Sequence, residues 1–177
     1  MTMLWEKVVV TAREFLFSNI NDSREYNEPI TRTKLIQFDW DPNFAAASVF
    51  VEIVWKMAIG RESQHEWQRL DRLFSPSAVA THCNFRGGKT YKTGNVPEKG
   101  AIVIWRKGNT WMGDMGIVSD VSADKSSFDV IQGSVMHGSD SIFLAVTERK
   151  GKMSALPFRY DKMNVLGFIY PPDREIK

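Results

Sequence analysis

The sequence predicts a single α+β domain in which N-terminal helices pack on a C-terminal antiparallel sheet. Two observations support this fold class. Apolar residues recur at helical spacing in the first half of the chain, and after Pro97 they form short runs separated by turn residues. Helices followed by strands are typical of the α+β class. With 177 residues the chain has the length of one domain with a proper core, and no internal repeat or linker divides it.

Four helices are expected before Pro97. The first ends near Asn19 and is indicated by Trp5, Val8, Ala12, Phe15 and Leu16 at helical spacing. A polar, turn-rich segment covers Asn21 to Pro29. After Asp41-Pro42-Asn43, the apolar stretch FAAASVFVEIVWKMAIG predicts a buried helix over Ala46 to Ile59 that stops at Gly60. The last two are expected from Glu62 to Phe74 and, after Ser75-Pro76-Ser77, up to a break at Arg86-Gly87-Gly88.

Five strands are expected after Pro97, where the apolar period changes from helical to strand-like. Each is a short apolar run bounded by turn residues, as in the strands of an antiparallel sheet. They are Ala101 to Trp105, Gly116 to Val121, Phe128 to Ile131, Ile142 to Arg149 and Val165 to Tyr170.

Composition and charge exclude several classes of protein. The chain is 43% hydrophobic and 25% charged, and its 23 basic and 21 acidic residues are well mixed, which argues against a nucleic-acid-binding surface. No apolar run approaches the ~20 residues of a membrane span. Glu6 and Lys7 stand where a secretory signal would be apolar, so no signal peptide is expected. The lone cysteine, Cys83, excludes an intrachain disulfide, and no residue spacing indicates a metal site or a cofactor.

Four motifs follow one another in the second half of the chain. They are PEKGAIVIW (Pro97 to Trp105), GDMGIV (Gly113 to Val118), FDVIQGS (Phe128 to Ser134) and LGFIYPP (Leu166 to Pro172), with SPSAVATH ahead of them. Their order and spacing resemble the CHAP amidase/endopeptidase family of the NlpC/P60 group, the papain-like peptidoglycan hydrolases. The resemblance spans roughly Val8 to Pro172 and implies a papain-like fold.

The family uses a cysteine at the start of the buried helix, a histidine opening the second strand, and a polar residue on the next strand that orients the imidazole. Phe50-Val51 places the cysteine position at Ala47, whereas Phe44 would place it at Ala45. The histidine position falls on Asp114. A carboxyl group with a pKa of ~3.9 acts as a base only if burial raises that pKa, and alanine offers it no thiol to activate.

The remaining family positions are changed as well. The acidic residue of the third strand becomes Gln132, the asparagine after it becomes Ser134, and the acidic residue after Pro-x-x-Gly becomes Ala101. A single engineered Cys→Ala substitution would explain Ala47 alone. The resemblance therefore implies a degenerate member of the family without an intact catalytic set.

An active hydrolase with a relocated nucleophile, or a mutated one, is the alternative. Ser48 follows Ala47, but one helical step turns its side chain by ~100°. Cys83 adjoins His82, which is poor geometry for a nucleophile and its base. Two further histidines lie elsewhere: His65 on a polar helix face and His137 in an expected loop.

The favoured hypothesis is an inactive domain that binds a protein partner in an assembly, or a peptidoglycan fragment. The resemblance makes a phage tail, an injection machine or a cell-wall system reasonable settings, and the cytoplasm or an assembled particle the expected location. Trp105 and Trp111 flank the turn that carries Asn109 and precedes Asp114. Indoles beside amide and carboxyl groups suit such a binding rim, although Trp105 at the end of an alternating strand can equally face the core.

Overall fold

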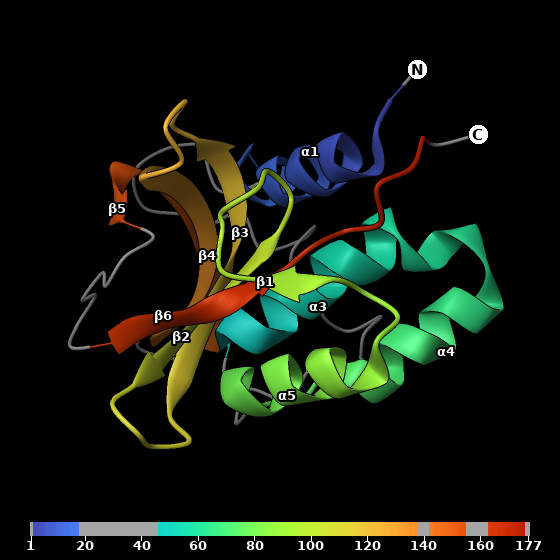
Figure 1. Ribbon diagram of the computed structural model, residues 1–177, viewed down its shortest axis with the longest axis horizontal. Helices are drawn as coiled ribbons and strands as arrows, with labels where there is room; N and C mark the ends of the chain where they lie inside the picture. The colour runs from blue at the N-terminus through green and yellow to red at the C-terminus, as the bar shows by residue number, and fades with distance from the viewer. Residues whose placement is uncertain (1, 18–45, 138–141, 155–162, 176–177) are drawn as a thin grey trace.

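The computed structural model describes residues 2–17, 46–137, 142–154 and 163–175. Within these ranges the helices precede the sheet, as predicted (Figure 1). The helices are α1 (Leu4–Phe17), α3 (Ala46–Ala58), α4 (Gln64–Leu73) and α5 (Ala78–Gly88), with the 3-10 turn η1 (Gly60–Glu62) after α3. The expected turn segments Asn21 to Pro29 and Asp41 to Asn43, together with Phe44 and Ala45, lie outside the described residues.

The strands form one antiparallel sheet in the order β1-β6-β2-β3-β4-β5. They are β1 (Thr93–Gly94), β2 (Ile102–Lys107), β3 (Gly113–Val121), β4 (Ser127–His137), β5 (Ile142–Ser154) and β6 (Met163–Ile169). The predicted α+β class is confirmed. Some details differ. β1 was not expected, and β3, β4 and β5 are longer than predicted, so His137 ends a strand instead of lying in a loop.

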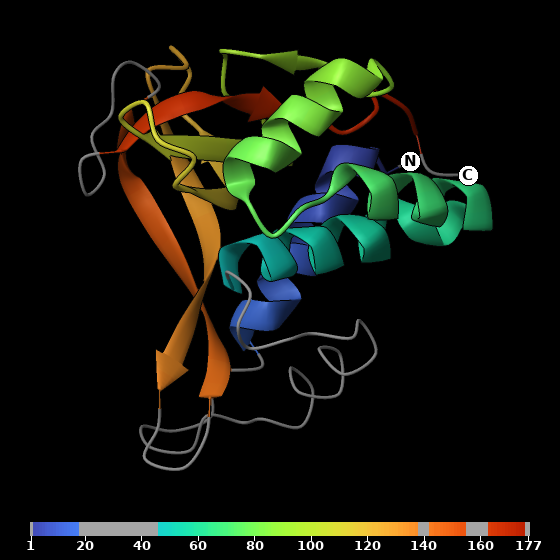
Figure 2. The same cartoon turned by 90° about the horizontal axis from the view of Figure 1, so that it is seen from below.

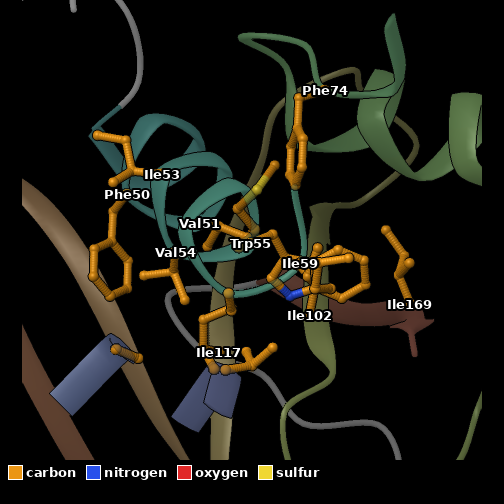
Figure 3. Close-up of a cluster of buried hydrophobic side chains, with 14 of the residues drawn as sticks. Phe50, Val51, Ile53, Val54, Trp55, Ile59, Phe74, Ile102, Ile117 and Ile169 are labelled. Carbon is orange, nitrogen blue, oxygen red and sulfur yellow. The ribbon is translucent and has the colours of Figure 1, made fainter. Parts of the chain in front are cut away.

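The described helices lie on one side of the sheet (Figures 1 and 2). α3 is the central one, because its side chains are buried against both the sheet and the neighbouring helices. Figure 3 shows Val51 and Val54 of α3, and Ile59 directly after it, among the sheet residues Ile102, Ile117 and Ile169. These residues belong to the helix-side cluster, which also contains Ala47 of α3, Leu4, Val8, Ala12 and Phe15 of α1, Leu70 of α4, and Ala78 and Phe85 of α5. Each fully buried side chain of this size stabilises the fold by ~1.5–3 kcal/mol.

Serine caps fix where the later helices begin. The Ser63 hydroxyl accepts a hydrogen bond from the Glu66 N–H at the start of α4, and the Ser77 hydroxyl accepts one from the Ala80 N–H at the start of α5. The expected break at Arg86-Gly87-Gly88 is displaced. α5 runs through both glycines to Gly88, and Lys89 caps it in the left-handed conformation at φ 55°.

One buried charge joins two helices. Lys56 of α3 is 7% exposed and forms ion pairs with Glu52 on its own helix and Asp71 on α4. Its ammonium also lies 5.5 Å from the centre of the Trp67 ring. The carboxylates and the ring compensate for the loss of water around the charge, so α4 is tied to α3 by polar as well as apolar contacts.

A second group of buried side chains occupies the opposite face of the sheet. Side chains alternate between the faces of a strand, so residues next to those of the helix-side cluster point away from the helices. This far-side cluster contains Ala101, Val103, Trp105, Val118, Phe128, Val130 and Phe168. In the described part of the chain, no helix has the length and hydropathy that crossing a membrane would require.

Candidate functional site

The hairpin between β2 and β3 presents the residues that the sequence singled out. Its turn is held by the Arg106 guanidinium, which donates to the carbonyl oxygens of Thr110 (2.7 Å) and Asn109 (2.8 Å). The Lys107 N–H donates to the Met112 carbonyl at 2.9 Å and closes the turn. The hairpin is therefore a fixed platform, with Asp114 just inside its second strand.

Asp114 and Gln132 are brought together by the sheet. The Gln132 side-chain amide donates to Asp114 Oδ2 at 3.2 Å, and the Met115 N–H donates to Asp114 Oδ1 at 2.8 Å. Gly116 makes the pair possible, because a Cβ atom at this position would lie only 2.8 Å from Gln132 Cγ. The second glycine of the GDMGIV motif thus leaves room for a side chain that crosses from β4 to β3.

Burial dominates the electrostatics of Asp114. Loss of water raises the pKa of Asp114 above its ordinary value. The hydrogen bond from Met115, the charge of Arg149 and the amide of Gln132 each lower this pKa, but they do not cancel the effect of burial. Arg149 stands opposite Val130 in the β4–β5 pairing and so shares the face of the sheet that carries Gln132.

The pair lies on the far side of the sheet. Asp114 is directly opposite Trp105 in the β2–β3 register, and Trp105 belongs to the far-side cluster. Ala47 is 8% exposed at the start of α3 and belongs to the helix-side cluster. Of the three predicted triad positions, Asp114 and Gln132 are therefore in contact, and Ala47 lies on the opposite face of the sheet.

Two buried polar atoms on this far face lack hydrogen-bond partners within the described residues. They are the indole Nε1 of Trp105 and the Oε1 of Gln132. The amide nitrogen of Gln132 donates to Asp114, and the amide oxygen of Gln132 can still accept a hydrogen bond. A carboxyl, a carboxamide and an indole N–H can together hold a polar group or a water molecule. They contain no nucleophile for covalent chemistry.

The two tryptophans have different surroundings. Trp105 is fully buried, so of the two alternatives for this residue the structure shows the one in which it faces the interior. It offers no surface at the rim. Trp111 is 75% exposed and Met112 is 48% exposed, next to the exposed Asn109. The rim of the hairpin therefore presents one indole and one thioether.

The remaining family positions lie in the sheet or at its start. Ser134 is in β4 opposite Ala145, and Ala101 is buried just before β2. Arg149, whose charge lowers the pKa of Asp114, was not among the site residues predicted from the sequence. Its only signal was its position on a predicted strand, and that position could not be paired with Asp114 before the register of β4 and β5 was known.

The alternative nucleophiles are engaged or poorly placed. Ser48 is 3% exposed, and its hydroxyl donates to the Pro76 carbonyl at 2.9 Å. Cys83 is exposed on α5, whereas its neighbour His82 is buried. Burial, and then the charge of Arg86, lowers the pKa of His82. Adjacent residues of a helix do not face each other, so Cys83 and His82 cannot form a nucleophile–base pair.

The last histidine of the described helices is His65. It is exposed on α4, with its Nδ1 3.3 Å from the guanidinium of Arg69. In the described ranges, histidine, cysteine and acidic residues do not gather in groups of three or more that could hold a metal ion.

No family model, no curated protein and no solved structure matches this chain. The resemblance to the CHAP family therefore stays a prediction from the sequence motifs and their order.

The raised pKa of Asp114 predicts how stability depends on pH. The folded chain holds the proton of the Asp114 carboxyl more tightly than the unfolded chain does. The stability that this protonated carboxyl contributes is therefore present at low pH and is lost as pH rises through the folded-state pKa. In Asp114→Asn the side chain at position 114 is neutral at every pH. If the Gln132 carboxamide flips, its Oε1 can accept a hydrogen bond from the amide of the new asparagine. We expect the variant to be at least as stable as the wild type at about pH 8, by urea denaturation.

Asp120→Asn on the same strand is the matched control. A hydrogen bond from Lys99 lowers the pKa of Asp120, so its charge stabilises the fold above the ordinary aspartate pKa, and its loss should not raise stability. If Asp114→Asn were clearly less stable than the wild type at about pH 8, the ionised carboxylate would be a stabilising group, contrary to this description.

Proposed function

We propose that this chain is a catalytically inactive domain of the CHAP type that acts as a binding or structural component. The observation that supports this most directly is the state of position 114. It carries a carboxyl group that is half-buried and hydrogen-bonded to Gln132 on the far side of the sheet. Position 47 carries alanine, so the covalent route of the family has neither its base nor its nucleophile.

The binding surface that we propose is the tip of the β2–β3 hairpin. Trp111 and Met112 are exposed there on a turn fixed by Arg106. Tryptophan and methionine are enriched at protein interfaces, and tryptophan is prominent among hot-spot residues. The Ser77 hydroxyl donates to the Trp111 carbonyl at 3.5 Å, which anchors the turn beside the start of α5. A fixed turn reduces the entropy lost on binding.

Two kinds of partner fit this proposal. A protein partner within an assembly, such as a phage tail, an injection machine or a cell-wall system, would use Trp111 as an anchor. A peptidoglycan fragment would use the same indole as a stacking face. Both settings come from the family resemblance, and the exposed hairpin tip suits either.

The runner-up is an active hydrolase whose nucleophile has moved. Only Cys83 offers a thiol, and it is exposed on α5 while the adjacent imidazole is buried. This arrangement favours the inactive interpretation.

We predict no hydrolysis of purified peptidoglycan sacculi. The turbidity of a suspension should fall no faster with the wild-type chain than in buffer, while an active CHAP enzyme serves as the positive control. The double variant Ala47→Cys/Asp114→His should also fail to give efficient hydrolysis, because the two positions lie on opposite faces of the sheet and oxyanion donors must also be in place. Turbidity loss by the wild type that disappears in Cys83→Ser would establish the runner-up.

Trp111→Ala should weaken binding without affecting the fold. The indole is 75% exposed, so the melting temperature should stay nearly constant. If it is a hot spot, affinity should fall by ~2 kcal/mol or more, roughly 30-fold. Cosedimentation with sacculi measures one class of ligand, and titration against a partner purified with the wild-type chain as bait measures the other.

Val10→Ala is the matched control, because Val10 is an exposed apolar residue of α1, 56% exposed and away from the hairpin. It should bind like the wild type. A Trp111→Ala chain that binds normally would remove the hairpin tip from the proposal.

A further inference from the structure

The described surface is also hollowed at the opposite end of the β2–β3 pair from Asp114. A cleft of about 680 Å³ opens between the start of α1, the segment before β1, the β1–β2 loop, the β3–β4 turn and the end of β6. Along β3 it begins at Val121, seven residues after Asp114 and therefore about 20 Å away. Its volume is typical of small-molecule sites.

Three aromatic residues line the cleft, Trp5, Tyr91 and Tyr170, and two glycines make room for Trp5 and Tyr170. A Cβ atom at Gly100, where φ is +78°, would lie 2.9 Å from the Cα of Trp5, so glycine lets the start of α1 approach the β1–β2 loop. A Cβ atom at Gly94 would lie 2.6 Å from the Tyr170 hydroxyl oxygen. That hydroxyl donates to the Val96 carbonyl at 2.8 Å and accepts from the Val96 N–H at 3.3 Å. Tyr170 is therefore held in place before any ligand binds.

Three lysines reach the same cleft from three segments. Lys99 is fixed by an ion pair with Asp120 at 2.6 Å. Lys92 and Lys125 also line the cleft and form no ion pair with any residue in the described ranges. Among the described residues that line the cleft, these two ammonium groups are thus the ones that no carboxylate pairs with.

Lys125 occupies a costly backbone conformation. Its φ is +58°, in the left-handed region where glycine or asparagine is usual. The turn around it is held by Asp124, whose carboxylate accepts hydrogen bonds from the Ser122 and Ser126 hydroxyls. The chain thus places a long cationic side chain at a position that suits glycine, which is consistent with a role for the side chain itself.

Two carboxylates complete the lining. Glu98 and Asp173 bring acceptors to the cleft, so its charge is mixed, with lysines in slight excess. Carboxylates accept hydrogen bonds from hydroxyl groups, lysines bind phosphate or carboxylate as point charges, and aromatic faces stack on rings. A sugar that carries an anionic group presents all three complementary features at once.

We propose that this cleft binds an anionic sugar, in which a phosphate or carboxylate group contacts Lys92 and Lys125. The sugar ring lies against Trp5 and Tyr170, and its hydroxyl groups donate to Glu98 and Asp173. The site is separate from the hairpin tip, so it stands or falls independently of the proposed function.

The test is an NMR titration of the isotope-labelled chain with four probes: glucose 6-phosphate, glucuronic acid, glucose and inorganic phosphate. At least one of the two anionic sugars should shift the backbone amides from Thr90 to Gly94 and at Lys125. It should bind at least about tenfold more tightly than glucose and than phosphate. Which of the two binds identifies the anionic group as a phosphate or a carboxylate.

The double variant Lys92→Gln/Lys125→Gln should weaken that binding by about tenfold or more. The control Lys107→Gln/Arg72→Gln removes the same two charges from exposed positions outside the cleft lining and should bind like the wild type. Absence of shifts at the cleft with both anionic sugars would overturn the proposal. So would phosphate binding as tightly as glucose 6-phosphate, because the cleft would then be a plain anion site, or equal binding by the two double variants.

Discussion

Burial of α3 is the constraint on which the rest of the structure depends. Its side chains fill the space between the sheet and the other helices, and Trp55 alone meets Phe74 and Phe85 edge to face at 6.3 and 5.7 Å. The sheet must present apolar side chains to α3, which fixes the register of β2 and β3 because a shift of one residue would turn every side chain to the other face. Asp114 and Gln132 are consequently directed away from the helices, and Ala47 is enclosed among apolar neighbours at the start of α3.

The Asp114–Gln132 pair is best understood as part of the fold. A carboxyl group deprived of water is costly when ionised. The side chain that donates a hydrogen bond to Asp114 is the neutral amide of Gln132 and not a cation. Gly116 leaves room for three groups of β4, namely the side chains of Val130 and Gln132 and the carbonyl of Ile131. Asp114 of the GDMGIV motif and Gln132 of the FDVIQGS motif thus form a small polar network on the far face.

Much of the fold could be predicted from the sequence, because long apolar periods are strong signals. The helix over Ala46–Ala58 and the antiparallel strands from Ile102 to Val121 are examples. The two-residue strand β1 could not be predicted, since Thr93–Gly94 carries no period. The contact of Asp114 with Gln132 followed from the order of motifs, but the opposite face taken by Ala47 depends on sheet register. The cleft lined by Lys92, Lys99 and Lys125 could not be predicted, because five segments that are separate in the sequence form it.

The most direct test of the account is a carbon-13 NMR titration of the Asp114 carboxyl, assigned with the Asp114→Asn variant. We expect a titration midpoint above the ordinary aspartate value of ~3.9, with the Gln132 side-chain amide signals shifting over the same pH range because the two groups are hydrogen-bonded. A midpoint at or below the ordinary value, with Gln132 signals that do not respond, would contradict it. The carboxyl group would then be solvated or paired with a cation, and position 114 would be free for a role other than the buried pair described above.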